Sequence, residues 1–293
     1  MSVVMPSLRV VLPDAAHYVH AHAFDEISIA LVAALRRLGV DVEVTHDCAQ
    51  GHARVLVLAP HLQSLPDLRR LDNDAILYTW EPMGWSHVVF MKPELTSLMS
   101  GFVVWDYSRN NVKTWRSLGA RRVVHVPFGY DRALEQFPAP QGEPVVDVLF
   151  YGSLNERRKA ILESLTGRGL RVKWLFGVYG QERDAWIARS RLVLNMHAHE
   201  GQILELPRLA YLWANRVPVV TETNPDTEDS LRMTGTMITA PYDELVDRVA
   251  EALDHPARLS VAVEDSYRRF AAGRHLADIL RDAFAASAVP IPA

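Results

Sequence analysis

The chain has 293 residues, of which 49% are hydrophobic and 23% are charged, and its formal net charge is −4. At about 150 residues per domain, this length predicts two domains, each with enough apolar residues for its own core. The slightly acidic balance excludes the basic surface of a general nucleic-acid-binding protein, so no stable nucleic-acid partner is expected. The single cysteine, Cys48, excludes an intrachain disulfide and favours a reducing, cytoplasmic location.

The sequence carries no recognisable targeting or membrane-spanning segment. Its first residues lack the charged region, apolar core and cleavage site of a secretory signal. No run of about 18 apolar residues is present, so no membrane span is expected. Peripheral membrane contact stays open.

The first half of the chain alternates short apolar runs with helical stretches. One helix is predicted at residues 24–38, where apolar side chains recur at helical spacing up to Gly39. This alternation predicts a parallel sheet in a doubly wound α/β lobe. The predicted strands are 8–12, 40–44, 55–58, 75–78, 102–105 and 123–126.

The second half restarts the same alternation after a linker at residues 137–144, which holds three prolines and a glycine. Strands are predicted at 145–151, 171–176, 192–195 and 218–220, and helices at 155–165, 182–189, 204–214, 242–253, 257–270 and 276–286. The fold class is therefore α/β, with two Rossmann-like lobes facing a central cleft at their strand ends. The predicted domains are 1–138, 145–272 and a separate C-terminal helix within 273–293.

The first candidate binding segment follows the first strand of the second lobe. Gly152 lets the backbone approach a ligand closely, and Ser153 or Asn155 can cap the next helix. The free N–H groups and the positive dipole end of that helix favour an anion. Arg157 and Arg158 oppose the helix dipole, and a bound diphosphate offsets that cost. A solvated basic turn is the alternative interpretation.

The second candidate segment follows the predicted strand that ends at residue 195. Its residues His197, His199 and Glu200 suggest a metal site, but their spacing is loop-like and no second ligand cluster accompanies them, so no metal is predicted. Glu205 and Arg208 lie three residues apart and share one helix face. They form either a surface ion pair or a site where Glu205 accepts from a ribose and Arg208 meets phosphate or steadies the glutamate.

The first lobe carries candidate catalytic residues at two strand ends. His20, His22 and Asp25 precede or open its long helix and could act as a base, an orienting group or acceptor-binding groups. The alternative is helix capping by Asp25 with solvent-facing histidines. At another strand end, Glu81 offers a carboxylate and Trp80 a flat face for a sugar, although such an aromatic side chain is equally consistent with the core.

A last candidate, Glu222, follows the buried strand at 218–220 and could be structural, capping or ligand-binding. Several well-known motifs are absent: there is no G-x-x-x-x-G-K-[ST], no G-x-G-x-x-G and no G-x-S-x-G. Their absence excludes P-loop NTPases and typical serine hydrolases, and it weakens the case for a nicotinamide-dependent dehydrogenase.

An ordered set of short segments resembles the glycosyltransferases of the GT-B fold, including bacterial proteins of the spore-maturation CgeB group. Two positions depart from the pattern: Pro207 stands where retaining members carry the second of two glutamates, and Arg216 stands where glycine is usual. The matching segments are 78–81, 104–108, 126–130, 147–153 with Arg157 and Arg158, 193–197, 205–209 and 214–222.

The resemblance implies a nucleotide sugar in the C-terminal lobe and an acceptor in the N-terminal lobe. Gly152, Ser153 and Arg158 would then face the diphosphate, and Glu205 and Arg208 the ribose–phosphate region. The helix at 276–286 would cross back onto the first lobe. No metal and no cofactor beyond the nucleotide diphosphate sugar are implied, because the helix dipole and basic groups offset the charge of the leaving diphosphate.

The sequence therefore predicts a metal-independent glycosyltransferase of the hexosyltransferase type. Its partners would be a nucleotide sugar and an acceptor that is a glycan, a lipid, a protein or a small molecule. The alternatives are a sugar-nucleotide epimerase on the same fold and a non-catalytic nucleotide-sugar-binding or scaffold protein. The donor sugar, the stereochemistry and the oligomeric state are left open.

Overall fold

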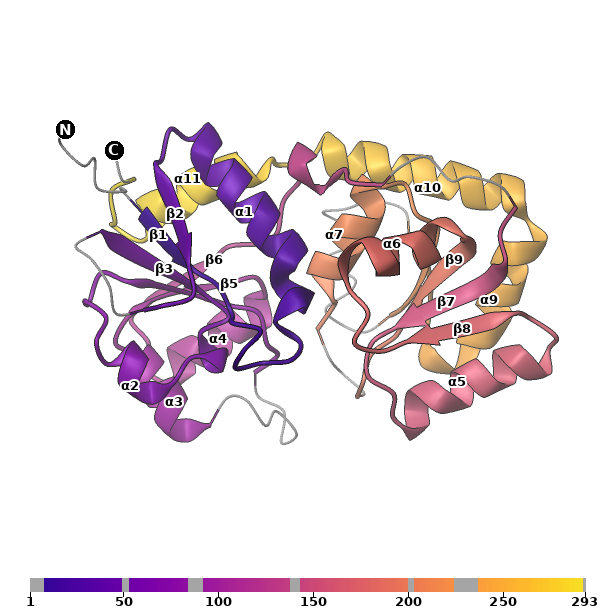
Figure 1. The fold of residues 1–293 in the computed structure, drawn as a ribbon, viewed down its shortest axis with the longest axis horizontal. Coiled ribbons are helices and arrows are strands. Elements are labelled where there is room, and N and C mark those ends of the chain that lie inside the picture. The colour runs from indigo at the N-terminus through magenta and orange to yellow at the C-terminus, as the bar shows by residue number, and fades with distance from the viewer. Residues whose placement is uncertain are drawn as a thin grey trace. The chain divides into compact units, whose positions relative to one another are not determined.

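The computed structural model describes residues 8–48, 53–83, 92–137, 143–199, 203–223 and 237–291. The chain divides into two compact units (Figure 1), the first made of Met1–Asp131 with His275–Ala293 and the second of Arg132–Arg274. Most of the predicted linker at 137–144 lies outside the described residues, as does Glu200. Each unit is described separately below.

The first unit is built on a six-stranded parallel sheet. Strands β1, β4 and β5 are buried at every position, because helices cover both faces of such a sheet. The strand order is β2-β1-β3-β4-β5-β6, and all six predicted strands are present with small shifts at their ends. Their bounds are β1 Leu8–Val11, β2 Val42–Thr45, β3 Arg54–Leu58, β4 Ile76–Thr79, β5 Val103–Asp106 and β6 Arg122–His125.

The helices of the first unit come from both ends of the described chain. Helix α11 (Leu276–Ala286) packs against α1 (Asp25–Arg37), and the Trp105 indole of β5 donates to Ser287 Oγ at 2.8 Å. The Trp105 ring also meets Phe284 edge-on at 5.0 Å. The remaining elements are η1 Ala21–Phe24, η2 Pro60–Leu62, α2 Leu65–Leu68, α3 Pro93–Met99 and α4 Arg109–Ser117.

The second unit is built on a five-stranded parallel sheet in the order β11-β10-β9-β7-β8. Its strands are β7 Val146–Tyr151, β8 Val172–Leu175, β9 Ser190–Asn195, β10 Val219–Glu222 and β11 Ile238–Ala240. The edge strand β11 was not predicted, because three residues are too few to show a pattern. The helices are η3 Arg132–Leu134, α5 Glu156–Gly167, α6 Gly180–Ala188, α7 Leu206–Ala214, η4 Tyr242–Glu244, α9 Leu245–Asp254 and α10 Pro256–Ala271.

Both sheets reverse their winding direction at one point. In the first unit β2 lies on one side of β1 and β3 lies on the other, so the reversal falls between β1 and β3. In the second unit β8 lies on one side of β7 and β9 on the other, so the reversal falls between β7 and β9. The predicted α/β fold class with two parallel sheets is thus confirmed. Ligands of open α/β sheets bind outside the carboxyl ends of the strands at such a switch point. Among the described helices, none is both long and apolar enough to cross a membrane.

Candidate functional site

A bare glycine turn follows β7 at the switch point of the second sheet. Gly152 has φ +135°, a conformation that favours glycine, and a Cβ there would lie 3.5 Å from Arg208 Nη2 and 3.9 Å from Arg158 Nη1. Its backbone is held in place, since its N–H donates to Leu175 O at 3.0 Å and its carbonyl accepts from Trp174 Nε1 at 2.9 Å. Backbone without a side chain is therefore presented beside two guanidinium groups.

Helix α5 begins directly after this turn, and Asn155 is its N-cap. The Asn155 Oδ1 accepts from the Arg158 backbone N–H at 3.0 Å, and the Asn155 amide donates to Ala198 O. Of the two predicted capping residues, Asn155 therefore makes the capping bond, whereas Ser153 lies exposed in the turn. The first turn of α5 presents N–H groups and the positive dipole end next to Gly152.

The Arg158 guanidinium is buried behind the turn. It donates to Ser153 O at 2.9 Å, to Ser153 Oγ at 3.1 Å and to Met196 O at 2.8 Å, and it lies 4.0 Å from a Glu205 carboxylate oxygen. Burial and the neighbouring Arg208 lower the pKa of Arg158 to about 10, so the group is still cationic at neutral pH. Arg158 thus connects the segments after β7 and β9, and it places a buried positive charge behind the Gly152 turn.

Arg157 forms a two-pronged ion pair with Glu222 at the end of β10. One guanidinium nitrogen donates to Glu222 Oε2 at 2.8 Å and to His197 O at 3.1 Å, and the other donates to Glu222 Oε1. The guanidinium also lies 3.8 Å from the centroid of the Tyr242 ring. Because Glu222 additionally accepts from the His197 backbone N–H at 2.9 Å, it connects the end of β10 with the first turn of α5 and the segment after β9.

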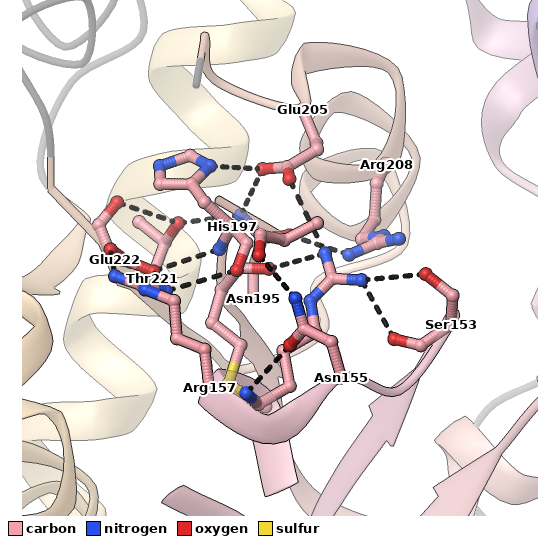
Figure 2. A network of polar contacts seen from close by, with 12 residues as sticks. Ser153, Asn155, Arg157, Asn195, His197, Glu205, Arg208, Thr221 and Glu222 are labelled. Atoms are coloured by element: carbon pink, nitrogen blue, oxygen red, sulfur yellow. Dashed lines mark hydrogen bonds and ion pairs between the residues drawn. The ribbon is translucent and has the colours of Figure 1, made fainter. Parts of the chain in front are cut away.

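A buried imidazole and a carboxylate face each other beside this pair. His197 Nδ1 lies 3.2 Å from Glu205 Oε2, and the His197 side chain is fully buried (Figure 2). Burial lowers the pKa of His197, but the Glu205 and Glu222 carboxylates outweigh it, so that the pKa is raised. Burial raises the pKa of Glu205, but His197, Arg208 and Arg158 lower it to about 2. The two groups therefore form a charged pair near pH 6.

Asn195, at the end of β9, links the glutamate to Arg208. Its amide donates to Glu205 Oε2 at 3.2 Å and to Thr221 Oγ1 at 2.8 Å, while its carbonyl oxygen accepts from Arg208 Nη1 at 2.8 Å. Arg208 also lies over the Tyr151 ring, 4.8 Å from its centroid. Asn195 was not among the predicted site residues, although a polar residue ending a buried apolar strand is a usable signal.

The second-unit cluster lies where the carboxyl ends of β7, β9 and β10 meet the N-terminus of α5. Among the described residues, it brings together four cationic groups and two carboxylates, namely Arg157, Arg158, His197 and Arg208 with Glu205 and Glu222. Such an arrangement suits a phosphate or diphosphate. Within the described residues, no group of three or more His, Cys, Asp and Glu side chains could hold a metal ion. All eight predicted binding residues lie in this cluster: Gly152, Ser153, Arg157, Arg158, His197, Glu205, Arg208 and Glu222.

The four predicted catalytic residues of the first unit are arranged differently. His22 Nδ1 contacts Asp25 Oδ2 at 3.0 Å in a pair whose side chains are 56% and 48% exposed. His20 meets the Tyr18 ring edge-on at 5.7 Å. Glu81 instead faces a residue that was not predicted, His61, whose Nε2 lies 3.6 Å from Glu81 Oε1.

Trp80 belongs to the core of the first unit. It is 6% exposed and stacks on Tyr107 with ring centroids 5.0 Å apart, and Phe128 meets it edge-on at 5.7 Å. The core interpretation of this aromatic side chain is therefore the correct one.

Comparison with curated proteins gives distant relatives only. No protein-family model matches the chain. The chain is 28% identical over 156 residues to one uncharacterized protein of Acanthamoeba polyphaga mimivirus and 25% identical over 202 residues to another. These matches cover 52% and 67% of this chain, and 15% and 68% of the two relatives. The chain thus spans only a small part of the first of these relatives.

The solved structures that match this chain include several glycosyltransferases. Anabaena HepE in complex with UDP and glucose matches with a TM-score of 0.61 at 11% identity, covering 95% of this chain and 98% of HepE. AviGT4, a glycosyltransferase involved in avilamycin A biosynthesis, matches with a TM-score of 0.53 at 16% identity, covering 97% of this chain and 97% of AviGT4. The DNA-modifying enzyme beta-glucosyltransferase matches with a TM-score of 0.57 at 11% identity, covering 96% of this chain and 99% of that enzyme. The chain therefore has the fold of the GT-B glycosyltransferases, and the predicted resemblance is confirmed at the level of the fold.

Proposed function

We propose that the protein is a glycosyltransferase that moves a sugar from a nucleotide diphosphate sugar to an acceptor. The observation that carries this proposal is the Gly152 turn, where bare backbone, the N-terminus of α5 and Arg208 Nη2 converge at the β7–β9 switch point. Fold neighbours crystallised with UDP-glucose support a nucleotide sugar as the donor.

In this proposal the diphosphate lies against Gly152 and the first N–H groups of α5, with Arg208 as the side chain that contacts it. Arg158 is already bonded to loop oxygens, so it contributes charge and holds the turn in place. Glu205, whose side chain is 25% exposed, accepts from the ribose hydroxyls. Its ionised state suits it to this role, because its pKa is about 2 through the neighbouring His197, Arg208 and Arg158, in spite of burial.

The proposed reaction requires charge stabilisation at the leaving group. The bond between the anomeric carbon and the diphosphate breaks, and the diphosphate takes up negative charge. Backbone N–H groups and arginines held in position beforehand stabilise such charge without reorganisation. We therefore propose that transfer needs no metal and no further cofactor, and that the first unit binds the acceptor.

Calorimetric titration with UDP in the presence of EDTA tests the donor site, and GDP, ADP, CDP and dTDP are used in parallel. Arg208→Ala is expected to weaken binding about tenfold or more, since a charge-assisted hydrogen bond contributes roughly 1.5–3 kcal/mol. Arg258→Ala, which removes the same charge from the exposed face of α10, serves as the control and should bind normally. Absence of binding for all five nucleotides would contradict the proposal.

Turnover separates the proposed transferase from the two alternatives. Release of the nucleoside diphosphate that depends on an added acceptor identifies a transferase. Conversion of the bound nucleotide sugar without any acceptor identifies an epimerase. Tight binding with no turnover across glycan, lipid, peptide and small-molecule acceptors identifies a binding protein.

A further inference from the structure

Asn195 lies between the two side chains that the proposed donor site uses for ligand contact. The residue ends β9, and its side chain is fully buried. Its amide nitrogen donates to Glu205 Oε2 at 3.2 Å, and its carbonyl oxygen accepts from Arg208 Nη1 at 2.8 Å (Figure 2). A single neutral side chain therefore contacts both the carboxylate and the guanidinium group.

The orientation of this amide group is fixed by its partners. The second amide hydrogen is donated to Thr221 Oγ1 at 2.8 Å, so both N–H groups and the carbonyl oxygen of Asn195 have a partner. A rotated amide would place its oxygen against the Glu205 carboxylate and its NH₂ group against the Arg208 guanidinium, which are two repulsive contacts. The network therefore has one favourable arrangement, and a fully satisfied buried network is rigid.

The contact with Asn195 leaves one oxygen of Glu205 for a ligand. Oε2 faces the Asn195 amide and His197 Nδ1, each at 3.2 Å. Oε1 lies 4.0 Å from Arg158 Nη2, which is beyond hydrogen-bonding distance. The Glu205 side chain is 25% exposed, so Oε1 is the oxygen that a ligand hydroxyl would contact.

Arg208 also uses one polar atom for Asn195. Nη1 donates to the Asn195 carbonyl oxygen, and Nη2 lies 3.5 Å from the position of a Cβ on Gly152. The Tyr151 ring supports the guanidinium group, with its centroid 4.8 Å away. Nη2 is therefore the nitrogen that a phosphate oxygen at the bare turn would contact.

We propose that Asn195 is the positioning residue of the donor site, and that it presents Glu205 Oε1 and Arg208 Nη2 to the ligand as a fixed pair. This inference rests on the proposed function. It narrows the ligand to a molecule that carries a hydroxyl donor close to an anionic phosphate, as a ribonucleoside diphosphate does. A nucleotide without ribose hydroxyls should lose the part of its affinity that depends on Glu205.

Calorimetric titration with UDP, 2′,3′-dideoxy-UDP and inorganic pyrophosphate tests this role. The unaltered protein should bind UDP about 10- to 100-fold more tightly than the dideoxy compound, the usual range for a hydrogen bond to a charged group. Asn195→Leu, which touches no ligand, should reduce this preference to about twofold or less and weaken pyrophosphate binding about five- to tenfold. Glu205→Ala should abolish the preference and leave pyrophosphate bound.

Two further variants separate positioning from a merely structural role. Thr221→Val removes the third partner of the Asn195 amide and should lower both the UDP preference and the pyrophosphate affinity, by less than Asn195→Leu does. Asn215→Asp is the matched control, because Asn215 bonds Leu134 O and the backbone of residues 136 and 137 in the same unit, so it should change the melting temperature only. If Asn195→Leu does not fold, an unchanged UDP preference in Thr221→Val overturns the role.

Nuclear magnetic resonance provides a readout that requires no ligand. The side-chain amide signals of Asn195, identified by their loss in Asn195→Leu, should shift in Glu205→Gln and in Arg208→Lys and stay in place in Arg258→Ala. Signals that ignore both of the first two substitutions overturn the network.

The two proposals fail in different ways. If UDP binds and folded Asn195→Leu keeps the full preference for UDP over the dideoxy compound, the positioning role is overturned and the donor site stands. If neither nucleotide nor pyrophosphate binds the unaltered protein, the proposed function fails and the positioning role fails with it, whatever the amide signals show about the network.

Discussion

At the scale of single residues, the second-unit site uses its arginines in two ways. Arg157 and Arg158 are bonded to Glu222 and to loop carbonyls, so they are held rigidly and supply charge. Arg208 is bonded through Nη1 to Asn195, while its Nη2 lies against the Gly152 turn. A ligand at this turn would therefore contact Arg208 directly, and the charges of Arg157 and Arg158 would stabilise it electrostatically.

Replacing Gly152 by alanine tests the bare turn. The φ of +135° is strained for alanine, at roughly 1–3 kcal/mol, and the new Cβ would cover the bare backbone while lying at ordinary van der Waals distance, 3.5 Å, from Arg208 Nη2. We expect lower thermal stability together with a large loss of UDP affinity by calorimetry. Gly169→Ala is the matched control, because Gly169 has φ +84° with nothing within 4 Å of a Cβ, so it should lose stability only. Equal UDP affinity in both variants would contradict the proposed site.

The His197–Glu205 pair predicts a stability maximum in pH. The pKa of His197 is raised, mainly by Glu205 against the effect of burial, so its contribution is complete below about pH 6.5 and is lost as the pH rises through the raised value. The pKa of Glu205 is lowered from 4.5 to about 2, so its contribution is complete above 4.5 and is lost as the pH falls towards 2. The melting temperature of the unaltered protein should therefore exceed that of His197→Gln most between pH 4.5 and 6.5. A difference that is constant from pH 4 to 9 would rule out the charged pair.

At the scale of elements, the start of α5 depends on a single side chain. Asn155→Ala removes the cap and should lower the free energy of unfolding by about 1 kcal/mol in urea titration. Asn155→Ser keeps a capping oxygen and loses the amide contact with Ala198, so it should lose less stability. If serine and alanine destabilise the protein equally, the Ala198 contact rather than the cap stabilises the element.

Elements with a strong local signal could be predicted from the sequence. Strands such as β1, β4 and β7 are mostly apolar runs, β2 alternates valine with polar residues, and α11 shows a clear helical repeat, so their positions follow from the pattern alone. Helix α2 spans only Leu65–Leu68 and edge strand β11 only Ile238–Ala240, and neither is long enough to show a period.

The grouping of the candidate site residues could be predicted to the extent that it is local. The second-unit site residues lie in a few short segments at predicted strand ends, so they could be named in advance. The His61–Glu81 contact joins two segments that follow different strands, and a histidine after a predicted strand carries no signal of its own partner. The packing of Trp80 in the core likewise depends on Tyr107 and Phe128, which lie in the segments after β5 and β6.

At the scale of the whole molecule, the first unit is assembled from two separate parts of the chain. Helix α11 belongs to it, although the entire second unit lies between α11 and Asp131 in the sequence. The helix buries five apolar side chains, and large ones contribute about 1.5–3 kcal/mol each. The sum is comparable with the roughly 5–15 kcal/mol that stabilises a typical domain. The buried side chains are Leu276, Ile279, Leu280, Ala283 and Phe284.

A chain ending at residue 274 should therefore lose the fold of its first unit selectively. Hydrogen exchange is expected to show loss of amide protection in the strands and helices of the first unit, β1 to β6, and retained protection in those of the second unit, β7 to α10. Adding a peptide of residues 275–291 should restore part of the protection. Full protection of the first unit without α11 would show that the helix is dispensable for its stability.

Because the first unit is assembled from two separate parts of the chain, it is completed later than the second unit during synthesis. Residues 132–274 form a continuous unit that is synthesised in full before α11. The first unit cannot be completed until α11 has been synthesised after the second unit. Until then, the side of α1 that packs against α11 is uncovered. Newly made chains that stall within this interval would expose that apolar surface to chaperones and proteases.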